Sequence, residues 1–336
     1  MTRRPQTVTL RMLAEQLGVS ASTVSRVLNS PGDTALRWGS AATIERIRAH
    51  AAEQGYTPNP QAASLRTARS GLVGVLVPRL QDFVLATVYE GIEEAALEHG
   101  LSTFVTNSLD DPDAQRQRAR MMIDRRVDGM IVGDAHLDHA VVDEIAARGV
   151  PVVLVSRRAG THASATCDDV QGGRLVGEHL VRTGRTRPAI IAGQAFASTA
   201  RDRTQGAVEA FAEAGIDVPA ERVVHGPFDA AGGRAAVETL LAAGDPPDAI
   251  FATNDFAAIG ALGALRDHGL RVPDDVALVG YNDTPLASEI LVPLTTIRSP
   301  MHQMGRSAVE LLIEVMAGRA PDSVLLEPEL VVRGTA

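Results

Sequence analysis

The 336-residue sequence contains no lysine, a single cysteine and few aromatic side chains, which make up 3% of the chain. All 32 basic residues are arginine, which we attribute to the codon bias of a GC-rich genome. Cys167 alone permits no intrachain disulfide, and no histidine is spaced with it for zinc, so a reducing cytoplasm fits best. There is no 18-residue apolar stretch, and no apolar run follows Arg3 and Arg4. The sequence therefore predicts neither a membrane span nor a signal peptide.

The composition is globular, with 45% hydrophobic and 22% charged residues, and the length suffices for two or three domains. This excludes a disordered chain, a collagen-like repeat and a disulfide scaffold. The net charge of −9 is unusual for a nucleic-acid-binding protein, but it is unevenly distributed. Residues 1–70 hold nine arginines and four acidic residues, a net charge of +5, whereas the rest of the chain carries −14. A small basic module thus precedes a large acidic body.

The basic segment carries two short helical patterns joined by a tight turn. Apolar residues at 10, 13, 14 and 17 have the spacing of an amphipathic helix, and Thr9 is a suitable N-cap. Gly18 supplies a left-handed stop, and Ser20 is placed to cap a second helix with Thr23 at its third position. Two helices joined by so short a turn cross steeply, which predicts a helix-turn-helix unit.

The second helix, residues 21–29, divides its side chains between two faces. Val24, Val27 and Leu28 lie on the side that packs against the first helix. The opposite stripe consists of Ala21, Ser22, Ser25, Arg26 and Asn29. Small side chains with one arginine suit close approach to a DNA groove, where Arg26 can bind guanine and Ser25 and Asn29 can reach phosphates. On these residues alone, an ordinary helical hairpin is the alternative.

A third helix is predicted over Ala41–Gln54, which completes a small three-helix core. The run Thr57-Pro58-Asn59-Pro60 then ends the helical pattern. It supplies a new N-cap, Asn59, with a proline at the first helical position. The helix expected next, over residues 61–66, is too short to be stable in water by itself.

Several consecutive motifs of this segment follow one known pattern: Gly18-Val19-Ser20, Thr23-Val24-Ser25-Arg26-Val27-Leu28-Asn29, Gly55-Tyr56-Thr57-Pro58-Asn59 and Ser64-Leu65-Arg66-Thr67. The segment resembles the DNA-binding headpiece and hinge of the LacI/GalR family of bacterial transcription regulators. The resemblance implies that Ala21, Ser22 and Arg26 read the major groove and that Leu65, from paired hinge helices, wedges into the minor groove. The alternative for Leu65 is packing within a linker helix. The expected DNA-contacting residues are Thr9, Ser20, Ala21, Ser22, Thr23, Ser25, Arg26, Asn29, Asn59, Ala62 and Leu65.

The connection between the second and third helices departs from the family pattern. Ser30–Gly39 is about five residues longer than usual, and it contains Trp38, the only tryptophan. We expect Trp38 to pack on the headpiece core, with contact to the DNA backbone as the alternative.

From residue 72, short β-rich runs alternate with amphipathic helical patterns, which predicts parallel sheets covered on both faces. The first series has strands at 72–78, 101–106, 129–133 and 152–155, with helices near 85–99, 113–126 and 138–148. The second series has strands at 188–192, 222–225, 249–253 and 276–280, with helices at 173–183, 201–214, 230–243 and 256–268. Residues 294–298 are expected to form a strand that returns to the first lobe, followed by a helix over 303–316.

Polar residues gather where these strands end, which is where doubly wound sheets bind ligands. From this pattern, the expected effector-contacting residues are Asp82, Phe83, Ser156, Asn254 and Asn282. No G-x-G-x-x-G, G-x-x-x-x-G-K or G-x-S-x-G motif and no metal-spaced histidine pair accompanies them, so we expect no enzyme activity, no cofactor and no metal. Asp168 and Asp169 are interpreted as a helix cap or turn rather than as a catalytic pair.

The body also resembles the family's effector-binding core, on Arg201-Asp202-Arg203, Thr253-Asn254-Asp255 and Val279-Gly280-Tyr281-Asn282-Asp283. By this resemblance Arg203, Asn254 and Phe228 contact the effector, whereas Asn282 replaces the family's usual aspartate. The fold class is then α/β, with a three-helix helix-turn-helix headpiece and a hinge helix before two doubly wound lobes of periplasmic-binding-protein type. The expected domains are a headpiece at 1–57, a hinge and linker at 58–70, a first lobe at 71–167 with 297–320, and a second lobe at 168–296 with 321–336.

The sequence therefore predicts a cytoplasmic, homodimeric transcription repressor with no membrane partner. Its expected partners are double-stranded, pseudo-palindromic operator DNA and a small polyhydroxylated effector, a sugar or sugar derivative. One alternative is a solute- or carbohydrate-binding protein of periplasmic-binding type without a regulatory role. A DNA-acting enzyme such as a recombinase is a second alternative, although no nucleophile or metal-binding carboxylate cluster supports it.

Overall fold

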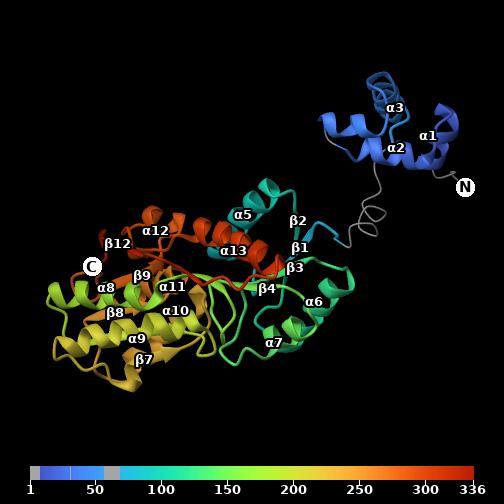
Figure 1. Ribbon diagram of the computed structural model, residues 1–336. Helices are drawn as coiled ribbons and strands as arrows, with labels where there is room; N and C mark the ends of the chain where they lie inside the picture. Colours follow the sequence, from blue (N-terminus) through green and yellow to red (C-terminus); the bar gives the residue numbers. More distant parts are fainter. Residues whose placement is uncertain (1–7, 31, 57–68) are drawn as a thin grey trace, which may run out of the picture. The chain divides into compact units, whose positions relative to one another are not determined.

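The computed structural model describes residues 8–30, 32–56 and 69–336 of the chain (Figure 1). The chain divides into two compact units, Met1–Ser70 and Gly71–Ala336. The hinge helix expected from the sequence, with Asn59, Ala62 and Leu65, lies outside the described residues. Within the described ranges, no helix combines the length and the apolar character needed to cross a membrane.

The first unit is a three-helix domain, as the sequence predicts. Its elements are α1 (Leu10–Leu17), α2 (Ala21–Leu28), the 3-10 helix η1 (Gly32–Arg37) and α3 (Ala41–Glu53). The apolar faces of the three α-helices meet in one small core, in which Leu13, Val24, Val27 and Ile47 are fully buried. Ala35 from η1 is also fully buried, so the long connection contributes to this core.

The first lobe of the second unit is a six-stranded parallel sheet with helices on both faces (Figure 1). Its strands, in spatial order, are β11 (Val324–Leu326), β5 (Ser164–Cys167), β4 (Val152–Val155), β3 (Gly129–Val132), β1 (Leu72–Val77) and β2 (Ser102–Asn107). Its helices are α5 (Phe83–Glu98), α6 (Pro112–Asp124), α7 (Ala140–Ala147) and α13 (Met301–Met316). The central strands are buried on both faces because helices cover both, which is typical of parallel sheets.

The second lobe repeats this plan with one antiparallel edge. Its strand order is β12 (Glu329–Val331), β10 (Thr295–Arg298), β9 (Ala277–Asn282), β8 (Ala249–Ala252), β6 (Pro188–Gly193) and β7 (Val223–His225). Its helical elements are α8 (Asp169–Arg182), α9 (Ser198–Glu213), η2 (Ala220–Arg222), α10 (Ala230–Ala242), α11 (Asp255–Asp267) and α12 (Pro285–Glu289). Only β12 runs antiparallel to its neighbour within the described sheet.

The path of the C-terminal segment corrects two predictions. Strand β10 does not return to the first lobe, because it pairs with β9 and β12 in the second sheet. Strand β11 lies beside β5 in the first sheet, so residues 321–336 do not all belong to the second lobe. A strand of three or four residues carries too short a pattern to predict which of two similar sheets it joins. The chain therefore crosses between the lobes after β5, between β10 and α13, and between β11 and β12.

Candidate functional site

The helix-turn-helix forms through the local contacts that the sequence predicts. The Thr9 side chain accepts a hydrogen bond from the Met12 amide, and Gly18 ends α1 in the left-handed region with φ of 66°. Ser20 Oγ accepts from the Thr23 amide at 3.1 Å and caps α2. Each cap satisfies backbone groups that the ends of these short helices leave unpaired.

Helix α2 presents the two faces expected from its sequence. Val24 and Val27 are fully buried, whereas Ala21, Ser22, Arg26 and Asn29 are exposed and Ser25 is half-buried. The polar residues of this helix do not all have free side chains. Ser20 Oγ lies 2.8 Å from Thr23 Oγ1, and Asn29 Nδ2 donates to the Ser25 carbonyl oxygen at 2.7 Å, so these groups close the two ends of α2.

The long connection behaves differently from our expectation. Trp38 is 40% exposed and takes no part in the apolar core, where Ala35 sits instead. The Trp38 ring lies under the Arg26 guanidinium, with Cζ 4.3 Å from the ring centroid. The expected packing of Trp38 on the headpiece core is therefore wrong, because a side chain as small as alanine is enough to anchor this loop.

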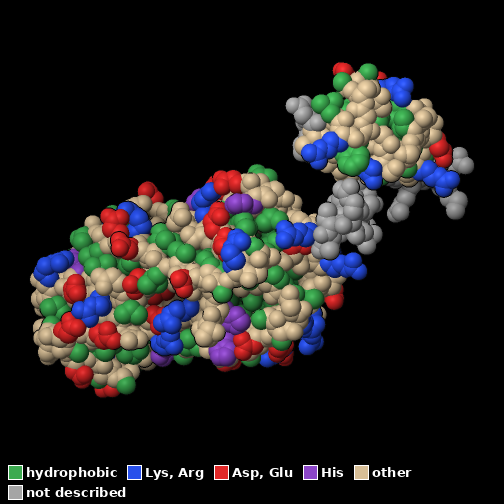
Figure 2. Space-filling model, viewed as in Figure 1, with side chains coloured by type: hydrophobic (Ala, Val, Ile, Leu, Met, Phe, Trp, Pro, Cys, Tyr) green, Lys and Arg blue, Asp and Glu red, His purple; other side chains and the backbone are tan. Residues whose placement is uncertain are grey.

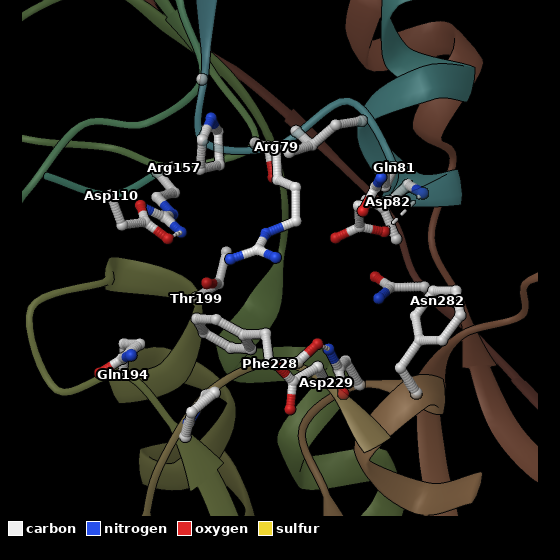
Figure 3. A pocket seen from close by; sticks show the side chains of 18 of the residues that line it. Arg79, Gln81, Asp82, Asp110, Arg157, Gln194, Thr199, Phe228, Asp229 and Asn282 are labelled. Atoms are coloured by element: carbon white, nitrogen blue, oxygen red, sulfur yellow. Dashed lines mark hydrogen bonds and ion pairs between the residues drawn. The ribbon is translucent and has the colours of Figure 1, made fainter. Parts of the chain in front are cut away.

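A cavity of about 420 Å³ lies between the two lobes of the second unit, lined by loops that follow the parallel strands (Figure 3). The first lobe contributes residues such as Arg79, Asp82, Asp110, Ser156 and Arg157. The second lobe contributes residues such as Gln194, Thr199, Arg203, Phe228, Asp229, Asn254, Phe256 and Asn282. The cavity thus sits at the carboxyl ends of the strands, where open α/β sheets bind ligands.

Of the seven effector-contacting residues expected from the sequence, six line this cavity and Phe83 does not. Phe83 begins α5, is 44% exposed and stacks on Phe256 with 6.2 Å between the ring centroids. Since Phe256 does line the cavity, Phe83 supports its wall across the two lobes. The expectation that ligands bind at the strand ends located the correct loop. It does not predict toward which side of the loop each side chain points.

Arg203 is buried and held from three sides. Its Nε donates to Asp169 at 2.8 Å, its Nη1 donates to the Thr253 carbonyl oxygen at 2.7 Å, and its Cζ lies 3.7 Å from the Tyr281 ring centroid. The guanidinium is therefore fixed in place before any ligand arrives. Asp168 caps α8 by accepting from the Gln171 amide, which confirms the interpretation of this pair as a helix start, and Asp169 has the further role of orienting Arg203.

Asn254 and Asn282 differ in how much of each amide is left for a ligand. Asn254 Oδ1 accepts from the Ala257 amide and caps α11, while its Nδ2 donates to the Phe228 carbonyl oxygen, so Asn254 positions Phe228. Asn282 is 3% exposed, has φ of 109°, and its buried Oδ1 has no partner within the described residues. A buried acceptor of this kind is costly unless something binds it.

Three charged residues of the first lobe also line the cavity, although they are not among the expected effector contacts. Arg157 is 6% exposed and pairs with Asp110 at 2.7 Å. The exposed Arg79 extends its guanidinium into the cavity, and no hydrogen bond or ion pair joins it to another described residue (Figure 3). All three follow β1, β2 or β4, so they lie at the same kind of strand end that predicted Asp82 and Ser156.

The Asp82 carboxyl faces Arg79 and Asn282 across the cavity (Figure 3). It caps α5 by accepting from the Val84 amide at 2.9 Å. Burial raises its pKa, although the Val84 amide and the charge of Arg157 oppose this shift. Asp82 is therefore a second acceptor that a ligand hydroxyl can reach.

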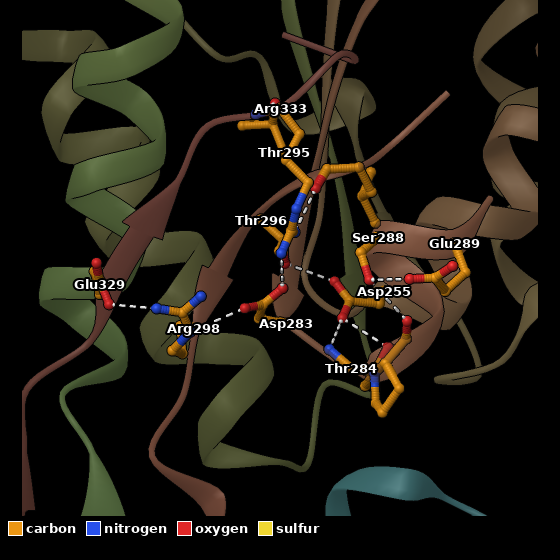
Figure 4. A network of polar contacts seen from close by, with 12 residues as sticks. Asp255, Asp283, Thr284, Ser288, Glu289, Thr295, Thr296, Arg298, Glu329 and Arg333 are labelled. Carbon is orange, nitrogen blue, oxygen red and sulfur yellow. Dashed lines mark hydrogen bonds and ion pairs between the residues drawn. The ribbon is translucent and has the colours of Figure 1, made fainter. Parts of the chain in front are cut away.

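A polar network joins residues that follow β8 and β9 to strand β10 of the second lobe (Figure 4). Asp255 accepts from the Thr284 amide at 2.7 Å, from its hydroxyl at 2.9 Å and from the Thr296 hydroxyl at 2.6 Å. Burial raises the pKa of Asp255 to about 6. Asp283 pairs with Arg298 and Arg333, so the turn that carries Asn282 is braced on both sides.

The two lobes also make direct contacts with each other outside the cavity lining. The Leu137 amide donates to the Phe196 carbonyl oxygen at 2.9 Å, and His136 stacks on the Phe196 ring at 4.0 Å. Arg158 pairs with Asp202 at 2.8 Å. These contacts join elements of different lobes without a covalent link, so they depend on how the lobes are arranged.

The part of the chain that the structure describes contains no group of histidine, cysteine and acidic residues arranged to hold a metal ion. On the face of the second unit shown in Figure 2, acidic and basic side chains are interspersed. Cys167 is buried, and burial raises its pKa to about 11, so it is not an activated nucleophile.

Comparisons with known proteins find matches in both units of the chain. Residues 9–59 match the family model described as "Bacterial regulatory proteins, lacI family", and residues 178–336 match a periplasmic binding protein-like domain. The chain is 31% identical over 330 residues to the HTH-type transcriptional repressor PurR of Photobacterium profundum, covering 97% of each chain.

Two solved structures extend this similarity to the whole fold. The lac repressor dimer bound to operator and the anti-inducer ONPF is 31% identical, with a TM-score of 0.87 over 98% of this chain and 99% of that one. The transcriptional regulator CelR in complex with cellobiose is 32% identical, with a TM-score of 0.75 over 99% of this chain and 100% of that one.

These relatives are transcriptional regulators, which sets aside both alternatives, a recombinase-like enzyme and a binding protein without a regulatory role. The match runs through the helix-turn-helix and the two-lobed core alike. The chain belongs to the LacI family of bacterial transcription regulators.

Proposed function

We propose that this regulator is a homodimeric repressor that binds a pseudo-palindromic operator and senses a small polyhydroxylated molecule, a sugar or sugar derivative. The observation that carries the proposal is the lining of the cavity between the lobes. It surrounds the half-buried ring of Phe228 with hydrogen-bonding groups from both lobes. The volume of about 420 Å³ falls within the range usual for small-molecule sites.

The chemistry of these groups suits a polyol. The unpaired Oδ1 of Asn282 and the carboxylate of Asp82 accept from hydroxyl groups, whereas Arg79 donates. The flat face of Phe228 provides apolar contact to a sugar ring. The similarity to the CelR-cellobiose complex supports a carbohydrate as the ligand class.

On the DNA side, we propose that α2 of each headpiece lies in a major-groove half-site. The exposed Ala21, Ser22 and Arg26 would face the base edges, and the Thr9 and Ser20 caps would orient the ends of α1 and α2 beside phosphates. Leu65 is assigned to the minor groove by the family resemblance. The similarity to a lac repressor dimer bound to operator supports a dimer that opens the minor groove between its half-sites.

The coupling between ligand and DNA requires that the effector prefer one arrangement of the lobes. The contacts of Phe196 with His136 and Leu137, together with the Arg158–Asp202 pair, join the lobes beside the cavity. A ligand that draws the lobes together or apart would change these contacts and the position of β1, which follows the linker.

An operator shift assay tests the proposal. A preferred duplex is first selected from a random pool with the full-length protein, and binding is then measured over a range of salt with a panel of mono- and disaccharides. We expect at least one sugar to change the operator affinity, and Leu65→Ala to weaken binding and reduce DNA bending. Unchanged affinity and bending for Leu65→Ala would refute the wedge. A complete absence of sugar response, with DNA binding intact, would refute the ligand class.

A further inference from the structure

The connection between α2 and α3 places the Trp38 side chain against the face of α2 that is predicted to read DNA bases. Within this connection, Ala35 is fully buried in the headpiece core. The Trp38 amide donates to the Ala35 carbonyl oxygen at 2.9 Å, three residues back along the chain. The buried Ala35 and this hydrogen bond fix where the backbone carries Trp38.

In this position Trp38 contacts Arg26, which is predicted to read the operator. Its ring centroid lies 4.3 Å from Cζ of Arg26, in the range of a cation–π contact. Both side chains are exposed, and no hydrogen bond or ion pair joins Arg26 to any other residue in the described part of the headpiece. The guanidinium carbon thus lies over the indole ring, while no described residue takes up the N–H groups of Arg26.

Stacking of this kind is compatible with reading a base. Arginine binds guanine through two N–H groups that lie in the guanidinium plane, and an aromatic ring stacked on the face of that plane leaves them free. A free arginine side chain loses rotamer freedom when it binds, so a partner that already restricts it lowers the cost of binding. The indole therefore preorganises the group that makes the contact.

We propose that Trp38 is a positioning residue for Arg26, so that the long α2–α3 connection contributes to base specificity without touching the base. This inference rests on the proposed function of Arg26 in reading the operator. A surface cation–π contact is weak, so we expect Trp38 to contribute about two- to fivefold in affinity. The effect should fall on the one base pair that Arg26 reads.

The simplest alternative is a contact of Trp38 with the DNA backbone. Trp38 is 40% exposed, so its indole N–H is accessible for such a contact. A backbone contact would strengthen binding to every sequence equally. Base discrimination therefore separates the two roles.

The contact can first be tested in the protein alone, because Trp38 is the only tryptophan of the chain. We expect Arg26→Ala to change the fluorescence yield of Trp38 and to increase its quenching by acrylamide. Arg37→Ala removes another exposed arginine, at the position next to Trp38, and should leave the emission unchanged. Identical emission in the wild type and Arg26→Ala would overturn the stacking.

The functional test uses the duplex selected with the wild-type protein and derivatives in which each base pair is replaced in turn. Discrimination is measured for the wild type, Trp38→Ala, Trp38→Tyr, Arg26→Ala and the double variant Arg26→Ala/Trp38→Ala. We expect Trp38→Ala to lower discrimination two- to fivefold at the position where Arg26→Ala abolishes it. Trp38→Tyr should retain most of it, and the double variant should match Arg26→Ala at that position.

The outcomes separate this inference from the function on which it rests. If Arg26→Ala changes discrimination at no base pair, the assignment of Arg26 as a reader fails. If Arg26→Ala abolishes discrimination at one position and Trp38→Ala leaves it intact, only the role of Trp38 fails. A uniform loss of affinity over all duplexes in Trp38→Ala would overturn the proposal in favour of a backbone contact. Circular dichroism of each variant checks that the headpiece remains folded.

Discussion

Two arginines assigned to function in this protein occupy opposite physical settings. Arg26 in the headpiece is exposed, and its guanidinium lies over the Trp38 ring. Arg203 in the second lobe is 5% exposed and is held by Asp169, the Thr253 carbonyl and the Tyr281 ring. The packing of the headpiece therefore does not depend on Arg26. The packing of the second lobe, in contrast, includes Arg203 and its partners. Stability and function should be separable in the first unit and coupled in the second.

The largest expected effect comes from Arg203→Gln. Loss of the guanidinium leaves the Asp169 carboxylate buried without its partner, which costs about 3–5 kcal/mol. The matched control is Arg234→Gln, since Arg234 and Asp267 form a pair with both side chains 44% exposed, where about 1 kcal/mol or less is expected. Denaturant unfolding of the second unit measures both. Equal losses for the two variants would contradict a structural role of Arg203.

A second test of the buried lobe uses pH. Burial raises the pKa of Asp255 from 3.8 to about 6, so the folded state binds this proton more tightly than the unfolded state does. The resulting stabilisation is present below pH 4 and is lost as the pH rises through 6, in total about 3 kcal/mol. Asp255→Asn keeps the size and removes the titration. The difference in unfolding free energy between the wild type and this variant should change over that interval and stay constant above pH 7. A constant difference throughout would show that Asp255 titrates normally.

Arg26→Ala tests the prediction that stability and function are separable in the headpiece. We expect no measurable loss of headpiece stability, because the side chain is exposed and bonds no buried group. Discrimination at one base pair in each half-site should fall by about 1–3 kcal/mol. Thermal unfolding and binding to single-base-pair variants of the selected duplex give the two values. A uniform loss over all sequences would indicate a phosphate contact instead of base reading.

Asn282 combines features of the two arginines. It is buried, as Arg203 is, but its Oδ1 has no hydrogen-bond partner among the described residues. Asn282→Asp restores the charge usual in the family and should improve discrimination between a sugar and its deoxy analogue by about five- to tenfold, close to 1 kcal/mol. Gln194→Glu makes the same chemical change elsewhere on the cavity lining. Isothermal titration calorimetry with both sugars should show the gain in the first variant only. The same gain in both would point to a general effect of charge.

The sequence predicted the helix-turn-helix and most of the alternating elements because caps and periodicity are local signals. It placed β10 in the wrong lobe, since a strand of four residues carries too short a pattern to predict which of two similar sheets it joins. In the cavity, the strand-end rule located the loops, but only tertiary packing turns Phe83 onto Phe256 and leaves the Asn282 oxygen unpaired. The Arg26–Trp38 contact joins residues twelve positions apart through a loop of unusual length, for which no local pattern exists.

The central claim is that an effector bound in the cavity between the lobes controls the affinity of the headpiece for operator DNA. Its most direct test is to measure operator affinity with and without a saturating effector sugar, and effector affinity with and without saturating operator. Linkage requires the two ratios to be equal, and we predict a common factor of at least five. An effector that binds in the cleft and leaves operator affinity unchanged would contradict the account.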